Sequence, residues 1–176
     1  MCGIVAYNGS KNAIPIVTSG LKRLEYRGYD SSGIAYMLDN DLKVIKQSGK
    51  VNLLEENTPK KLSSNISMGH TRWATHGVPS DENAHPHLSM NNKLAIVHNG
   101  IIENYSTIKE GLKNRGYVFK SDTDTEVLIN LIDDVKKNEN INLFQAVQLA
   151  LSQIIGAYAI VILDSENPNK LVVAKK

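Results

Sequence analysis

The stretch Gly3-Ile4-Val5-Ala6-Tyr7, directly after Met1 and Cys2, is a short apolar run that predicts a buried β-strand. A second continuous apolar run, residues 157–163, lies near the other end of the chain and predicts another buried strand. Strands so far apart in sequence can lie in two stacked sheets that helices cover. The apolar pattern by itself leaves that arrangement open.

Between these two runs the chain predicts strands, then helices, then strands again. The further strand candidates are residues 33–38, 42–47, 66–70, 94–98 and 171–174. Asp39-Asn40-Asp41 predicts a turn that joins the first two into a hairpin. Helices are expected to begin after Asn12, Asn104, Thr123 and Asn142, which are residue types typical of helix N-caps. Hairpins in place of strict βαβ alternation indicate an α+β domain with antiparallel sheet.

Two local patterns within these elements make sharper predictions. Thr123 and Glu126 have capping-box spacing, and the helix that they open carries an apolar face on residues 127, 128, 131, 132 and 135. The strand over residues 94–98 is expected to end at Asn99-Gly100. Taken alone, Asn-Gly is more typical of a tight hairpin turn than of a catalytic element.

Composition narrows the class of protein. A chain of 176 residues with 41% hydrophobic and 22% charged residues suits one soluble domain or one lobe of a larger enzyme. The net charge is +2 and the basic residues are scattered, which argues against a nucleic-acid-binding face. No apolar stretch approaches the roughly 20 residues of a membrane span, and the first residues do not resemble a signal peptide. We therefore expect a cytoplasmic protein.

Cys2 is the single cysteine of the chain, so no internal disulfide can form. A lone cysteine is usually a small core residue, but this one follows the initiator methionine, and a small residue there permits removal of Met1. A free thiol has a pKa of about 8.5, whereas an α-amino group titrates near about 7.7–8.0. An N-terminal cysteine therefore carries both a nucleophile and its base. While Met1 remains, that nitrogen is an amide and the chain is an inactive precursor.

Attack of a thiolate on an amide needs donors for the developing oxyanion. The side-chain amide of Asn99 and the backbone N–H of Gly100 are candidates. An amino-acid substrate also presents a carboxylate, which suits the planar guanidinium of Arg72, and an ammonium, which suits Asp124. In isolation, a carboxylate at a helix start is explained as well by compensation of the helix dipole.

The segment after Arg72 and the histidines offer further candidates. Gly77 and Pro79 make residues 75–80 a predicted mobile lid, and Trp73, the only tryptophan, has packing as its alternative role. Five histidines occupy positions 70, 76, 85, 87 and 98. Without a second cysteine or a His-Glu-x-x-His pattern, they predict no metal site.

Six segments, taken together and in order, resemble the N-terminal glutaminase domain of the glucosamine-6-phosphate synthase family, a class II glutamine amidotransferase. They are residues 2–5 (Cys-Gly-Ile-Val), 24–31 (Leu-Glu-Tyr-Arg-Gly-Tyr-Asp-Ser), 70–77 (His-Thr-Arg-Trp-Ala-Thr-His-Gly), 83–87 (Asn-Ala-His-Pro-His), 98–104 (His-Asn-Gly-Ile-Ile-Glu-Asn) and 123–127 (Thr-Asp-Thr-Glu-Val). The resemblance covers essentially the whole chain. The related amidophosphoribosyltransferases share residues 2–5 and 98–100 but differ at 25–30 and 72–76, which favours the glucosamine branch.

The resemblance implies one domain over residues 1–176 with a four-layer αββα N-terminal-nucleophile hydrolase fold, in which two stacked antiparallel sheets lie between helices. It implies that Cys2 is the nucleophile, that its α-amine is the base, and that Asn99 and Gly100 form the oxyanion hole. It also implies that Arg72 binds the carboxylate of L-glutamine and that Asp124 binds the ammonium. No cofactor and no metal are expected.

The same resemblance assigns Trp73, Thr75 and His76 to the loop that closes over glutamine, and Arg27 to support of the pocket around the N-terminus. It implies a C-terminal isomerase domain outside this chain, where the ammonia converts fructose 6-phosphate to glucosamine 6-phosphate, and a homodimer of the full-length enzyme. No nucleic-acid or membrane partner is expected. The alternatives are the glutaminase domain of another class II amidotransferase, such as an amidophosphoribosyltransferase, and a non-catalytic binding module.

Overall fold

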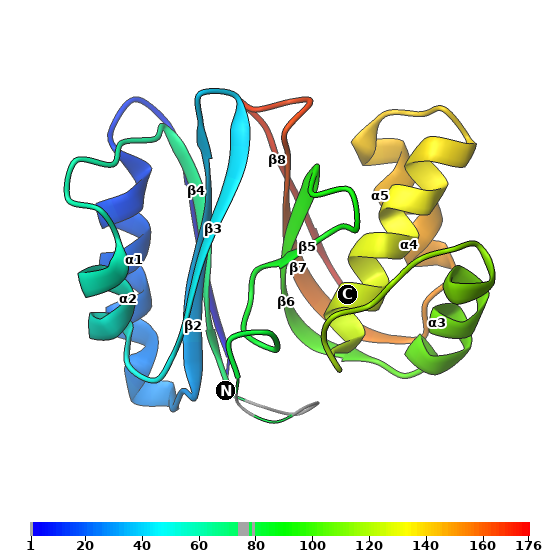
Figure 1. The fold of residues 1–176 in the computed structure, drawn as a ribbon, viewed down its shortest axis with the longest axis horizontal. Helices are drawn as coiled ribbons and strands as arrows, with labels where there is room; N and C mark the ends of the chain where they lie inside the picture. Colours follow the sequence, from blue (N-terminus) through cyan, green and yellow to red (C-terminus); the bar gives the residue numbers. More distant parts are fainter. Residues whose placement is uncertain (1, 74–77, 79) are drawn as a thin grey trace.

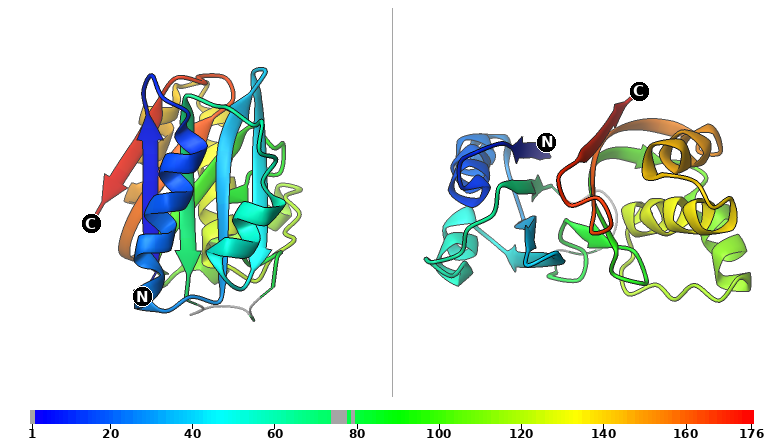
Figure 2. Two further views of the ribbon diagram at one scale, coloured as in Figure 1. Left: turned by 90° about the vertical axis from the view of Figure 1, so that its left-hand side faces the viewer. Right: turned by 90° about the horizontal axis from the view of Figure 1, so that it is seen from above.

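The computed structural model describes residues 2–73, 78 and 80–176 of the chain. These residues form four layers (Figure 1). Two four-stranded sheets pack face to face in the middle, with two helices on one side and three on the other. The view from above in Figure 2 shows the same order of layers. The predicted α+β class and the αββα layering are therefore confirmed.

The first sheet is antiparallel and carries the N-terminal strand at its edge. Its strands, in spatial order, are β1 (Gly3–Asn8), β4 (Ile66–Arg72), β2 (Ser31–Leu38) and β3 (Asp41–Ser48). The predicted β2–β3 hairpin is confirmed, with Asp39 and Asn40 at φ values of 51° and 65° in its turn. Helices α1 (Ala13–Leu24) and α2 (Val51–Asn57) cover the outer face (Figure 1). Asn12 caps α1 as predicted, because its side chain accepts a hydrogen bond from the N–H of Ile14.

The second sheet is also antiparallel, and its strands come from the later part of the chain, after those of the first sheet. Its strands, in spatial order, are β5 (His87–Leu88), β6 (Leu94–Ile102), β7 (Gly156–Asp164) and β8 (Leu171–Lys175). Helices α3 (Tyr105–Asn114), α4 (Asp124–Asn138) and α5 (Leu143–Ser152) cover its outer face (Figure 1). A short 3-10 helix, η1 (Glu25–Arg27), follows α1. The two apolar runs at opposite ends of the chain thus form strands in different sheets, but the prediction that both are buried is only partly right. Strand β1 lies at a sheet edge, where Ala6 is exposed and only Gly3 is buried, and β7 is buried from Ile160 onward.

Strand β6 does not end at Asn99-Gly100, and the hairpin-turn alternative for this pair is wrong. Asn99 pairs with Ala159 and Gly100 with Tyr158, so the ladder with β7 continues to Ile102. The long neighbour β7 offers backbone partners beyond His98, which is information that a local turn signal does not contain.

Two of the predicted helix caps differ in detail. The side chain of Asn104 does not cap α3; it accepts from the N–H of Ile155 and donates to the carbonyl of Gln153, each at 2.9 Å. Thr123 caps α4 by accepting from the N–H of Glu126 at 3.2 Å. The Glu126 carboxylate turns away to residues 120 and 121, so only half of the predicted capping box forms.

The sheets are held together by an apolar core, and each sheet packs on its helices through another. The buried side chains between the sheets are Ala35, Met37, Ile66, Met68, Ala95, Val97, Val161 and Leu163. The predicted apolar face of α4 is confirmed, because residues 127, 128, 131, 132 and 135 are all buried in the cluster against the second sheet. None of the helices in the described ranges is long and apolar enough to cross a membrane.

Near the start of β1 this apolar core gives way to four buried histidines. His70 on β4 lies on the same face as Met68, toward the second sheet, and its ring stacks on His85 with 4.3 Å between centroids. His85 packs edge-on against His87 of β5 at 4.7 Å, and His98 lies on β6. All four side chains are at most 6% exposed. The cluster therefore connects the two sheets at one end of the fold.

Burial decides the charge of these imidazoles. Loss of hydration, together with the nearby His98 and Arg72, lowers the pKa of His70 to about 3. Loss of hydration, then the surrounding histidines and Arg72, also lowers the pKa of His85 well below its ordinary value. The pKa of His87 is lowered well below its ordinary value by burial and by Lys46. At neutral pH these three histidines are uncharged.

We expect the free energy of unfolding to fall as the pH decreases from about 6.5 toward about 3. The unfolded chain protonates these histidines near pH 6.5, whereas the folded chain does not, so the unfolded state binds more protons in this interval. Their stabilising effect is complete above pH 6.5 and is lost as the pH falls. His87→Gln should flatten the dependence by up to about 1.4 kcal/mol per pH unit in urea titrations at pH 6.5 and 5. An unchanged slope would contradict this account.

The core between the sheets makes a second prediction. Met68 is fully buried, so Met68→Ala should lower the free energy of unfolding by about 2–5 kcal/mol, because it removes apolar contacts and leaves a cavity. Val173, which is 66% exposed on β8, supplies the matched control, and Val173→Ala should change the stability by no more than about 0.5 kcal/mol. Guanidinium denaturation of both variants measures the difference; equal losses would show that the sheet interface is not a close-packed core.

Candidate active site

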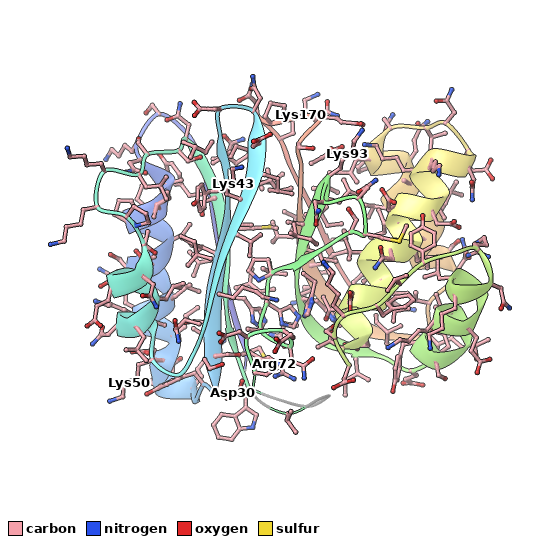
Figure 3. All side chains as sticks on the ribbon, in the orientation of Figure 1. Asp30, Lys43, Lys50, Arg72, Lys93 and Lys170 are labelled. Atoms are coloured by element: carbon pink, nitrogen blue, oxygen red, sulfur yellow. The ribbon has the colours of Figure 1, made fainter. Side chains whose placement is uncertain are left out.

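A cavity of about 380 Å³ lies where β1 begins, at the same end of the sandwich as the histidine cluster. Its volume suits a small metabolite. Its walls come from both sheets and from α4, and they consist of Cys2, Arg72, Trp73, His85, His98, Asn99, Gly100, Ile101, Thr123, Asp124 and Thr125. Figure 3 labels Arg72 at this end of the two sheets, close to the N-terminus marked in Figure 1. Six of the predicted site residues thus line one cavity.

Cys2 lies in the cavity wall with its thiol partly exposed. Its Sγ accepts a hydrogen bond from the N–H of Trp73 at 3.2 Å and lies 3.5 Å from the carbonyl oxygen of the same residue. Pairing of Gly3 with Thr71 sets this position, because it puts the residue before β1 beside the end of β4. Met1, whose removal would free the α-amine, lies outside the described residues.

Asn99 brings β6 of the second sheet to the cysteine. Its Nδ2 donates a hydrogen bond to the carbonyl of Cys2 at 3.2 Å. The next residue, Gly100, has a φ of 151°, which side chains rarely adopt, and a Cβ there would collide with the carbonyl of Ala157. It would also lie 2.8 Å from Nε2 of His98. Position 100 therefore has to be glycine for β6 to pass the cavity in this shape.

Asp124 is the first residue of α4, and only 5% of it is exposed. Its Oδ2 accepts a hydrogen bond from the backbone N–H of Ile102 on β6 at 2.8 Å. The carboxylate thus lies at a helix N-terminus, where the helix dipole favours negative charge, and it also borders the cavity. The dipole role and a role toward a cationic ligand are compatible in this geometry.

Arg72 is the last residue of β4 and is almost completely buried. Its Nη1 lies 3.7 Å from Oδ1 of Asp30 and 3.4 Å from the carbonyl of Val78. Asp30 also accepts a hydrogen bond from the hydroxyl of Ser31 at 2.9 Å. The turn over residues 26–31, which in isolation is an ordinary connection, therefore supplies the carboxylate that holds this guanidinium. Figure 3 shows the labelled Arg72 and Asp30 close together.

Trp73 borders the cavity with 53% of its surface exposed. Gly28, which has a φ of 88°, packs against its ring so closely that any side chain at position 28 would collide with it. Arg27 is exposed, lies over the ring of Tyr26 and does not line the cavity, so its supporting role stays a prediction. Thr75 and His76, the two other residues assigned to the closing loop, lie outside the described residues.

Five residues of the cavity wall were not predicted as site residues from the sequence: Ile101, Thr123, His85, His98 and Thr125, of which the last three form one hydrogen-bonded group. In the sequence, the histidines suggest only a role as metal ligands. Within the described ranges, however, no group of three or more His, Cys, Asp or Glu residues could hold a metal ion. The hydroxyl of Thr125 instead lies 2.9 Å from a ring nitrogen of each histidine. The signal was present, because all three belong to the segments that carry the family resemblance.

The charges and donors of the cavity suit one kind of small molecule. A buried guanidinium and a buried carboxylate can bind the two charged groups of a free amino acid. A thiol and an amide donor lie together, where they can act on a carbonyl carbon and its oxygen. The geometry is therefore that of a site for acyl transfer from an amino-acid side chain.

Comparisons with known proteins identify the family of this chain. A family model described as the glutamine amidotransferase domain matches residues 70–176. Glutamine–fructose-6-phosphate aminotransferase (isomerizing) of Bacteroides thetaiotaomicron is 57% identical over the whole chain, and that of Pyrococcus horikoshii is 46% identical. The chain spans 29% of the length of each of these relatives.

Solved structures give the same fold. Glutamine phosphoribosylpyrophosphate amidotransferase from B. subtilis superposes with a TM-score of 0.83 at 30% identity, covering the whole of this chain and 37% of that one. A structure titled as the allosteric regulatory enzyme of purine biosynthesis gives 0.85 at 32%, with the same coverage. The predicted N-terminal-nucleophile hydrolase fold is confirmed, and the higher identities to the aminotransferases favour the glucosamine branch. By its sequence and its fold, this chain belongs to the glutamine amidotransferase family of enzymes.

Proposed function

We propose that this chain is the glutaminase domain of a glutamine–fructose-6-phosphate aminotransferase and that it hydrolyses L-glutamine to glutamate and ammonia. The observation that carries the proposal is the meeting of Cys2 with Asn99 at a cavity that Arg72 and Asp124 also border. Sequence identity to named aminotransferases supports the choice of branch.

The first half of the reaction begins once Met1 has been removed. The freed α-amine of Cys2 takes the thiol proton, and the thiolate attacks the side-chain carbonyl carbon of glutamine. The oxygen becomes an oxyanion, which the amide of Asn99 and the N–H of Gly100 stabilise. The Asn99 amide has two N–H groups, so one can hold the carbonyl of Cys2, as in the structure, while the other serves the oxyanion.

The second half releases both products. The tetrahedral intermediate collapses, the C–N bond breaks, and the α-ammonium gives its proton to the leaving nitrogen, so ammonia departs and a γ-glutamyl thioester remains on Cys2. A water molecule, deprotonated by the same amine, then attacks the thioester carbon. The C–S bond breaks, the sulfur regains a proton, and glutamate leaves. Glutamine and water have become glutamate and ammonia.

Recognition of glutamine is assigned to charges that the fold already holds in place. Arg72 is kept by Asp30 and by the Val78 carbonyl, and Asp124 by the N–H of Ile102. Binding therefore requires little rearrangement of either side chain, which preserves affinity. Trp73, Thr75 and His76 are proposed to close over the substrate.

The remaining assignments concern the whole protein. Because the chain spans 29% of its relatives, a C-terminal domain is implied for the full-length protein. We propose that this domain is the isomerase domain, that it uses the ammonia to convert fructose 6-phosphate to glucosamine 6-phosphate, that the full-length enzyme is a homodimer, and that it works in the cytoplasm.

The nucleophile is tested by removing the sulfur and, separately, the free amine. Cys2→Ala should abolish glutamate formation, because nothing else in the cavity can form the thioester. A chain whose Met1 is retained should be as inactive although its thiol is intact, since its nitrogen is an amide. Coupled glutamate assays, with intact mass to verify the N-terminus, measure both. Full activity of a chain that keeps Met1 would disprove the mechanism.

The two sides of the cavity should affect different kinetic constants. Asn99→Ala should lower kcat by about 10²–10³-fold with little change in KM, because it removes an oxyanion donor. Asp124→Asn should raise KM for glutamine about tenfold or more, because it removes the charge that pairs with the ammonium. Steady-state kinetics of both variants give the comparison. A purely kcat effect of Asp124→Asn would show that the carboxylate does not bind substrate.

A further inference from the structure

We propose that Thr125 is a positioning residue that fixes the oxyanion-hole segment of β6 and the glutamine-binding Asp124 relative to each other. The proposal deepens the proposed function and rests on it. Thr125 is 1% exposed and borders the cavity, and its hydroxyl also lies 3.4 Å from Oδ1 of Asp124.

The hydroxyl of Thr125 is a junction between two histidines. Its Oγ1 lies 2.9 Å from Nδ1 of His98 and 2.9 Å from Nε2 of His85. A hydroxyl has one proton to donate, so at least one of the two rings must donate to it. These two hydrogen bonds fix the orientation of both rings. The ring that donates must carry a proton on the nitrogen that faces Thr125, so the tautomer of at least one ring is fixed as well.

The orientation of the His98 ring bears on the oxyanion hole. Its Nε2 lies against the α-carbon of Gly100, where a Cβ would come within 2.8 Å. Holding Nδ1 on Thr125 therefore holds the ring against the backbone that is to donate to the oxyanion. A ring free to rotate about its side-chain torsions would withdraw that support.

The first two residues of α4 form hydrogen bonds to β6 on both sides of Asn99-Gly100. Thr125 bonds to His98, directly before the pair, and Asp124 bonds to the N–H of Ile102, shortly after it, at 2.8 Å. Two anchor points on one helix start determine both the position and the tilt of the strand between them. The ammonium-binding carboxylate and the oxyanion donors are thereby set at a fixed distance.

The other arm of the junction extends to the first sheet. His85 stacks on His70, which lies two residues before Arg72 on β4. The carboxylate-binding strand, the oxyanion strand and α4 therefore meet at one hydroxyl and the rings that it orients. A role limited to core packing would be served equally by valine, which has the shape of threonine without the hydroxyl.

The test separates recognition of glutamine from reactivity of the thiol. Iodoacetamide alkylates Cys2 without using the pocket, whereas 6-diazo-5-oxo-L-norleucine, a glutamine analogue, must be bound by it. In the mature chain, Thr125→Val should lower the analogue rate relative to the iodoacetamide rate by about tenfold, as expected for loss of a buried hydrogen bond. Thr125→Ser, which keeps the hydroxyl, should restore the ratio to within about threefold of the parent.

A second pair of variants makes the test independent of how well Thr125→Val folds. The amide of glutamine can take the place of Nε2 of a histidine, and that of asparagine the place of Nδ1. His85 uses Nε2, so His85→Gln should keep more of the analogue-to-iodoacetamide ratio than His85→Asn. Equal ratios in these two, a parental ratio in Thr125→Val, or a serine variant as impaired as the valine one would overturn the inference. A parent chain that reacts with iodoacetamide but not with the analogue would instead overturn the proposed function.

Discussion

The contact between Cys2, directly before β1, and Asn99 on β6 is the constraint on which the site depends. Cys2 and Asn99 are far apart in the chain and belong to different sheets, yet a hydrogen bond joins the amide of one to the carbonyl of the other. Neither sheet contains a complete set of reactive groups. Packing of the two sheets through Met68 and its neighbours is therefore a condition for catalysis as well as for stability.

This constraint explains which parts of the structure could be predicted from the sequence. The β2–β3 hairpin and the buried face of α4 are local patterns, and both were confirmed. The apolar run of β1 correctly predicted a strand but not its burial, because its position at the sheet edge depends on tertiary pairing. The course of β6 through Asn99-Gly100 was not predictable, because it depends on pairing with β7 about 60 residues later. The Glu126 carboxylate likewise accepts hydrogen bonds from the backbone N–H groups of residues 120 and 121 and does not complete the capping box. This partner depends on the path of the loop before the helix, which the sequence pattern does not reveal.

The same division applies to the site. Residue chemistry and the family resemblance indicated Cys2, Arg72, Asn99 and Asp124, and the structure brings these four to one cavity. The partners that hold them were not predictable. Asp30 beside Arg72 is a tertiary contact, and so are the hydrogen bonds of Thr125 to His85 and His98. In the sequence, the histidines were considered only as metal ligands, and their spacing did not support a metal site.

Keeping the buried imidazoles neutral has a consequence for recognition. Desolvation lowers the pKa of His85, which lines the cavity, and of His70, which stacks on it, so neither of these two rings adds positive charge beside Arg72 at neutral pH. A cationic histidine in that wall would attract the carboxylate of a substrate away from Arg72 and would repel its ammonium from Asp124. Uncharged rings also lower the local dielectric, which would strengthen the two ion pairs that are proposed to orient glutamine. Under the proposed function, Arg72 and Asp124 would then set the direction in which a bound amino acid lies, with its side chain toward Cys2.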